Sequence, residues 1–171
     1  MDALFQMVVD HVPTPKVEEG PFRLLATTIS SDPFLGRILT GRISSGTVKP
    51  NQQIKVLARD GTLVEQGRVS KVLAFRGLER VPVDEGVAGD IVSLAGMTKA
   101  NVADTFCDPS VTIPIEAQAI DPPTISMTFR VNDSPLAGTE GTKVTSRIIW
   151  ARLLKEAEGN VALKADRATD A

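Results

Sequence analysis

The chain has 171 residues, of which 42% are hydrophobic and 23% charged, and its formal net charge at pH 7 is −2. This length allows one large domain or two small ones with buried cores, and the composition is ordinary for a globular protein. The net charge excludes a strongly basic nucleic-acid binder. A local basic patch stays open, because phosphate binding needs clustered charge rather than net charge.

The single cysteine, Cys107, and the single histidine, His11, restrict the chemistry. One cysteine cannot form an internal disulfide, so we expect a reducing compartment and a buried structural thiol. One histidine cannot supply a Ser-His-Asp triad or a histidine-based metal cluster. No apolar run approaches the roughly 18 residues of a membrane span, and the first residues lack the basic region of a signal peptide. The sequence predicts a cytoplasmic protein.

Residues 2–12 have the spacing of a helix, with Leu4, Val8 and Val12 on one face and Pro13 after them. The polar, proline-containing stretch up to residue 20 is typical of a linker. A short helix without a partner before it is unusual for an N-terminus. We therefore expect it to be the last element of a preceding domain.

From residue 21 onward, short β-type runs alternate with turn signals. Asp60-Gly61 is typical of a hairpin turn, and Gly67 is a candidate β-bulge. Strands spaced about ten residues apart predict an antiparallel barrel or sandwich, and a closed barrel protects its edges without covering helices. The runs are residues 22–30, 36–43, 53–58, 63–75, 81–83, 90–95 and 111–115.

A second linker is expected around residues 120–123, and a β-α-β pattern follows it. The predicted elements are a strand over 125–131, a glycine-rich loop, a helix over 144–157 and a strand beginning at 161. One such unit cannot close a core because its sheet lacks further strands. We therefore expect the chain to stop within a domain.

No motif for nucleotide hydrolysis is present. Gly36 and Gly41 have the separation of P-loop glycines, but no Gly-Lys-Ser/Thr follows and no helix is predicted after them. The loop 138–143 precedes a helix that could receive an anion, although a flexible loop with a helix cap is the interpretation we favour. A catalytic carboxylate pair stays open as an alternative. The acids that fall in predicted turns, where solvated side chains are ordinary, are Asp84, Glu85 and Asp90.

Charge is distributed unevenly along the predicted barrel. Residues 37–80 contain nine basic and three acidic side chains, a difference of +6, whereas five acids lie between residues 84 and 108. This asymmetry could give the barrel a positive flank that meets phosphates, or the charges could be scattered around it. The lack of tyrosine and the single tryptophan favour recognition of RNA backbone or shape over base stacking.

The run from Gly41 to Val56, Gly-Arg-Ile-Ser-Ser-Gly-Thr-Val-Lys-Pro-Asn-Gln-Gln-Ile-Lys-Val, resembles the signature of the second, barrel domain of translational GTPases of the elongation factor Tu type. Later stretches resemble the BipA/TypA family, and the resemblance extends over essentially the whole chain. The most specific motif is the loop Asn-x-Ser-Pro-x-x-Gly-x-Glu-Gly. These later stretches are residues 77–81, 89–92, 131–141 and 159–163.

The resemblance implies a fold class and a domain plan. The fold is mainly β: an antiparallel barrel like domain 2 of elongation factor Tu, followed by a partial ferredoxin-like α+β domain. Residues 1–20 would end a GTPase domain, 21–115 would form the barrel, 116–123 a linker, and 124–171 the first half of the ferredoxin-like domain. GTP and Mg²⁺ would bind in a GTPase domain outside this chain. Because the P-loop, Asp-x-x-Gly and Asn-Lys-x-Asp motifs are missing, we expect no catalytic, cofactor or metal site here.

The resemblance also implies a function, a ribosome-docking portion of a translational GTPase that acts in translation, ribosome assembly or the stress response. Its partners would be small-subunit ribosomal RNA at the intersubunit face and its own GTPase domain, with no membrane or DNA. An intramolecular scaffold that relays nucleotide state with little RNA contact is the alternative. Arg37, Arg42 and Arg68 fall within strands and could be structural. The candidate RNA-binding residues are Lys49, Lys71, Arg76, Arg80, Lys143 and Arg147.

Overall fold

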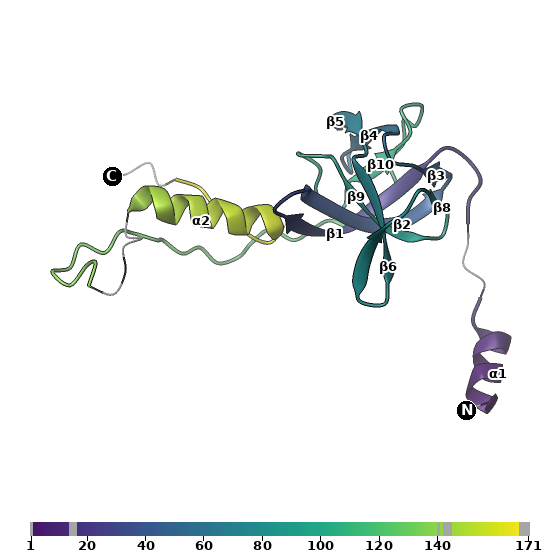
Figure 1. The fold of residues 1–171 in the computed structure, drawn as a ribbon, viewed down its shortest axis with the longest axis horizontal. Helices are drawn as coiled ribbons and strands as arrows, with labels where there is room; N and C mark the ends of the chain where they lie inside the picture. The colour runs from purple at the N-terminus through teal and green to yellow at the C-terminus, as the bar shows by residue number, and fades with distance from the viewer. Residues whose placement is uncertain (1, 14–16, 140, 142–144, 168–171) are drawn as a thin grey trace.

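The computed structural model describes residues 2–13, 17–139, 141 and 145–167. A barrel of short strands occupies the middle of the chain, and the two helices stand on opposite sides of it (Figure 1). The elements are α1 (Asp2–His11), β1 (Arg23–Asp32), β2 (Gly36–Ser45), β3 (Thr47–Val48), β4 (Gln53–Leu57), β5 (Leu63–Arg68), β6 (Lys71–Arg76), β7 (Glu79–Pro82), β8 (Gly86–Val87), β9 (Ile91–Ala95), β10 (Thr105–Cys107) and α2 (Ser146–Gly159).

Eight strands form one antiparallel sheet in the order β5-β4-β10-β1-β2-β9-β6-β7, and β3 pairs with β8 in a separate ladder. The sheet closes through the residues between β5 and β6. The Asn51 and Val69 amides donate to the Val69 and Gln52 carbonyls at 2.7 and 3.0 Å, and the Ser70 amide donates to the Ala95 carbonyl at 2.8 Å. These bonds join the β4 side of the sheet to β9. The predicted mainly β fold, with its antiparallel barrel, is confirmed.

The core lies inside the curled sheet. Leu24, Leu39, Ile54 and Phe106 are completely buried there, and they come from four different strands. Removing such side chains from water contributes about 1.5 to 3 kcal/mol each. A single cluster contains buried side chains from β1, β2, β4, β6, β9 and β10, so these strands share one hydrophobic centre.

Gly41 is a packing residue rather than part of a phosphate loop. A Cβ atom at this position would lie 2.0 Å from the carbonyl oxygen of Leu25 on β1, and backbone cannot move aside as a side chain tip can. The β1–β2 register shifts next to this contact, between Ala26 and Thr28. The close approach of the two strands therefore requires glycine at residue 41.

The predicted strand over 63–75 is wrong in one respect, because the structure divides it into β5 and β6. Val69 bonds to Asn51 and Gln52, just before β4, while Ser70 bonds to Ala95 of β9, so the chain changes partners between them. The predicted bulge at Gly67 is also wrong. Gly67 pairs regularly with Ile54, and the register shift lies between Val56 and Leu57.

At the end of the barrel, the structure contains a strand that the sequence patterns missed. β10 has three residues and pairs with both β1 and β4. The predicted strand 111–115 is absent; Val111 instead packs beside Cys107, and the Ile115 amide donates to Thr105 Oγ1 at 2.9 Å. Acidic residues on both sides of β10 made this short run resemble a loop.

Outside the barrel, both predicted helices are present and the predicted strands 125–131 and 161–163 are not. The apolar side chains of α1 are exposed, and no residue of α2 is fully buried. A lone strand leaves its backbone donors and acceptors unpaired, and the described residues offer no neighbouring strand. Of the expected β-α-β unit, the structure therefore shows only the helix.

Candidate nucleic-acid interface

The β6–β7 hairpin carries three of the predicted RNA-binding side chains. Its register pairs Arg76 with Glu79 and Phe75 with Arg80. Gly77, with a φ of 64°, makes the tight turn, and Leu78 at the tip is fully exposed. The hairpin extends away from the body of the barrel (Figure 1). Because it ends in a two-residue turn, its cations are presented on a short ordered projection.

Arg80 is held in place by two contacts. Its guanidinium carbon lies 5.3 Å from the centroid of the Phe75 ring, and its Nη1 donates to Ser30 Oγ at 2.9 Å. A cation over an aromatic face is stabilised by the ring quadrupole. Arginine has five N–H donors, so these contacts leave others that can reach an oxyanion. Arg80 is thus an exposed but pre-positioned cation.

Lys71 and Arg76 stand at the two ends of β6, and both are exposed. Within the described part of the chain, neither side chain forms a hydrogen bond or an ion pair. The pKa of Asp32 is lowered first by hydrogen bonds from the Leu35 and Phe34 amides, and Lys71 lowers it further through its charge. Lys71, Arg76 and Arg80 are therefore exposed cations spread along β6 and β7, and we call them the hairpin cations. Alternation along the strands places Lys71 and Arg80 on one face and Arg76 on the other.

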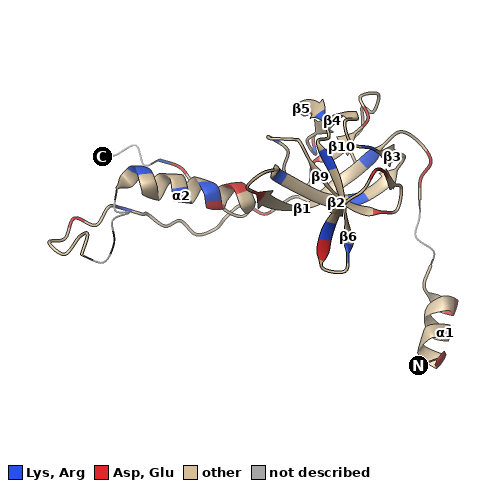
Figure 2. Ribbon diagram, viewed as in Figure 1, with Lys and Arg blue, Asp and Glu red and all other residues tan. Residues whose placement is uncertain are grey.

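The other predicted site residues are not brought to this hairpin. Lys49 lies beside the β3–β8 ladder, where its Nζ is 3.5 Å from Glu85 Oε1, and Figure 1 shows this ladder apart from β6. Arg147 is an exposed residue in the first turn of α2, on the far side of β1. Lys143 lies outside the described residues. Basic residues also occur on several other strands (Figure 2), so the charge excess of the sequence is not confined to one hairpin.

Arg37 has a structural role, which is one of the two roles that the sequence left open for it. Its Nη1 donates to the carbonyl of Thr98 at 3.1 Å, which ties β2 to the loop before β10. Glu65, which the sequence analysis did not single out, holds the same loop: its carboxylate accepts hydrogen bonds from the amides of Lys99 and Ala100 at 2.7 and 2.6 Å. No local pattern marks a residue whose partners lie more than thirty positions away.

The acids that follow the basic region serve mainly as turn caps. Asp90 Oδ2 accepts from the Val87 amide at 3.0 Å, and Asp104 Oδ2 accepts from the Asn101 amide at 2.7 Å. Burial raises the pKa of Asp104, against the effects of the Asn101 hydrogen bond and the Arg37 charge. These carboxylates belong to local turn structure.

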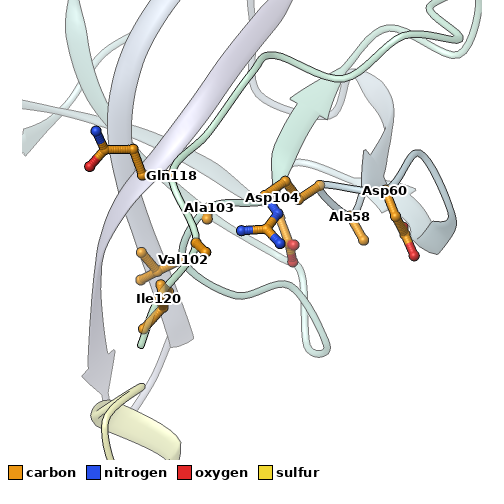
Figure 3. Close-up of a pocket in the computed structure, with 9 residues that line it drawn as sticks. Ala58, Asp60, Val102, Ala103, Asp104, Gln118 and Ile120 are labelled. Atoms are coloured by element: carbon orange, nitrogen blue, oxygen red, sulfur yellow. The ribbon is translucent and has the colours of Figure 1, made fainter. Parts of the chain in front are cut away.

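A pocket of about 390 Å³ lies beside the 58–60 turn and the 102–104 loop, and Gln118 and Ile120 complete it (Figure 3). Asp60 and Asp104 both line it, but they do not point toward each other in this view. Asp60 accepts two bonds from Thr62, which lower its pKa, and Asp104 caps its own loop. The pocket therefore shows no convergent acid–base pair.

The described residues show no sign of two other kinds of site. They contain no group of three or more His, Cys, Asp or Glu side chains placed to hold a metal ion. Neither described helix has the length and apolar character needed to cross a bilayer.

The class of domain follows from the fold together with a family comparison. Residues 36–107, which run from β2 through β10, match the family model described as elongation factor Tu domain 2. This match lies within the expected barrel and covers its strands from β2 onward.

Similarity extends beyond the barrel to proteins named large ribosomal subunit assembly factor BipA. The chain is 44% identical to that of Escherichia coli K12 over 172 aligned residues, which cover all of this chain and 28% of the relative. The Salmonella typhimurium protein is 42% identical, again over all of this chain and 28% of the relative. The Synechocystis protein is 44% identical over 97% of this chain and 28% of its own length. These matches confirm the resemblance to the BipA family that the motifs predicted. The chain spans a little over a quarter of the length of these relatives.

Proposed function

We propose that this chain is the ribosome-docking portion of a BipA-like translational GTPase and that the hairpin cations contact ribosomal RNA phosphates. The observation that carries the proposal is that β6 and β7 carry three exposed cations, Lys71, Arg76 and Arg80, in a chain similar over its whole length to ribosome assembly factors. The protein would act in the cytoplasm in ribosome assembly, translation or the stress response. Lys49, Lys143 and Arg147 would make secondary contacts.

The arrangement favours contact with RNA backbone over reading of bases. Arg80 covers one face of Phe75 at 5.3 Å, so that ring is partly occupied by its own chain. Phosphate contacts position a protein without reading sequence, and a guanidinium held by two neighbours loses little freedom when it binds an oxyanion. Such contacts release counterions from RNA, so the binding should weaken steeply with salt.

The whole protein would hydrolyse GTP with Mg²⁺ in a GTPase domain outside this chain, and that domain would be a partner of the barrel. The RNA surface would be that of the small subunit at the intersubunit face. The name of these relatives refers to assembly of the large subunit. The binding experiment should therefore include both subunits separately.

The decisive variant replaces Lys71, Arg76 and Arg80 together by glutamate in the full-length protein. We expect sedimentation with ribosomal subunits to show binding weakened by at least about tenfold, and the slope of log affinity against log salt to fall by roughly 2 to 3. A matched control replaces three other exposed cations, Arg59, Arg68 and Lys99, by glutamate. Equal losses in the two variants would reduce the effect to net charge and contradict a hairpin site.

The alternative function is an intramolecular scaffold that relays nucleotide state. It is favoured by cations that already have partners within the chain, Arg80 with Ser30 and Lys49 with Glu85. The exposed apolar side chains of α1 would suit packing on another domain. Unchanged subunit binding by the glutamate variant, together with altered GTP hydrolysis by the whole protein, would favour this scaffold.

A further inference from the structure

The segment before the barrel is bonded to a specific corner of it. Glu18 forms an isolated parallel bridge with Ser45, and its amide donates to the Ser44 carbonyl at 3.2 Å. Before the chain enters β1, residues 17–22 therefore run alongside the end of β2. Helix α1 is separated from this bonded segment by residues 12–16.

Side chains reinforce the backbone contact. Arg23 Nη2 lies 2.6 Å from Glu18 Oε2, and Arg23 Nε donates to Ser45 Oγ at 3.2 Å. The Ser45 hydroxyl in turn donates to the Pro21 carbonyl at 2.7 Å. Ser45 is fully buried, so its hydroxyl needs these partners, and they are all residues of the segment or its junction with β1.

The corner is shaped for close approach of the segment. Gly46 has a φ of 69°, and a Cβ there would lie 2.6 Å from the amide nitrogen of Phe22. Phe22 itself is buried in the core, which fixes the segment at its barrel end. The Glu18 carboxylate, in contrast, belongs to a side chain that is 65% exposed. The segment is therefore fixed at Phe22 by the core, whereas Glu18 is held by its ion pair with Arg23 and by its backbone bond to Ser44.

We propose that Glu18, Arg23 and Ser45 form a linker anchor, a conformational device that sets where the tether of α1 leaves the barrel and that can open while the barrel stays folded. The proposal is independent of RNA binding. Its physical basis is that Glu18, 65% exposed, is held by one ion pair and a backbone hydrogen bond, whereas Phe22 is held by the hydrophobic core of the barrel. Local opening of such contacts needs far less free energy than global unfolding.

Hydrogen exchange of the Glu18 amide tests the anchor directly. Replacing Arg23 by methionine keeps the aliphatic stem but removes the bonds to Glu18 and Ser45. We expect exchange of the Glu18 amide to accelerate by about tenfold, with the paired amides of β2 and β9 changed by less than about twofold. Arg23→Lys, which can keep the ion pair without the fork, should give an intermediate rate, and Arg68→Met is the matched control. Unchanged protection of Glu18, or equal loss of protection in β2 and β9, would overturn the proposal.

A distance measurement reports on α1 itself. Spin labels on Gln6→Cys and Thr62→Cys would be compared with and without Arg23→Met. Cys107 is fully buried, and burial raises its pKa to about 11, so it should not compete for the label. We expect a broader or shifted distance distribution when the anchor is removed. An identical distribution would show that the anchor does not control the placement of α1.

Discussion

Residues 22–107 and residues 120–139 both contain alternating apolar patterns, but only the first region forms strands. Ile54 and Phe106 in the barrel are completely buried, whereas Ile125 is 86% and Phe129 57% exposed. The sequences of the two regions are locally similar. What differs is the supply of neighbouring strands, since a β pattern becomes a strand only when its backbone can be paired. A segment with a β-type sequence pattern therefore forms a strand only where a neighbouring strand is present to pair with its backbone.

The largest difference in stability should appear when a phenylalanine is replaced by alanine in each of the two regions. Phe106→Ala would leave a cavity at the centre of the barrel and should lower the free energy of unfolding by about 3 to 5 kcal/mol. Phe129→Ala removes an exposed ring and should change it by less than about 0.5 kcal/mol. Urea denaturation of both variants provides the measurement. A similar loss in both would mean that the 120–139 segment is packed in solution.

A glycine comparison should give the next largest effect. Gly41→Ala forces a methyl group against the Leu25 carbonyl, where the Cβ would stand 2.0 Å from the oxygen, and should cost about 1 to 3 kcal/mol or more. Gly159→Ala, at the end of α2, meets no atom within 4 Å and should be close to neutral. Thermal unfolding followed by circular dichroism distinguishes them. A stable Gly41→Ala variant would contradict the close β1–β2 contact.

The smallest expected effect on stability is the pH-dependent contribution of the Asp104 carboxylate in the barrel. Burial raises the pKa of Asp104 above 3.8, so the folded state binds its proton more tightly than the unfolded state does. Its contribution to stability is therefore fully present below the unfolded pKa and is lost as pH rises through the folded pKa. Because the group is partly exposed, the effect is screened. We expect Asp104→Asn to be a few tenths of a kcal/mol more stable than the parent at pH 7, with no such advantage near pH 3.

Urea denaturation across this pH range checks the sign, with Asp133→Asn in the exposed 120–139 region as the control. Asparagine at residue 104 can still accept the Asn101 hydrogen bond through its carbonyl. A less stable Asp104→Asn variant at pH 7 would therefore show that the charge itself strengthens the loop, contrary to the burial argument.

Part of the candidate site could be predicted and part could not. The sequence predicts Lys71, Arg76 and Arg80 as RNA-binding candidates near loops, and in the structure they lie on the neighbouring strands β6 and β7. No local pattern indicates that Arg80 donates to Ser30, because Ser30 is fifty residues away along the chain. It also could not show that Lys49 stands apart from that hairpin beside Glu85. Whether these cations bind RNA stays a prediction.

By itself, the sequence determined the elements whose signals are local. The two helices follow from apolar spacing, most strands follow from alternation bounded by turn residues, and the family follows from motifs such as residues 41–56. Tertiary structure decided the features that depend on distant partners: the division of 63–75 into two strands, the three-residue β10, and the absence of strands at 125–131. The physical reason is that a helix satisfies its hydrogen bonds within one segment, whereas a strand depends on residues far along the chain.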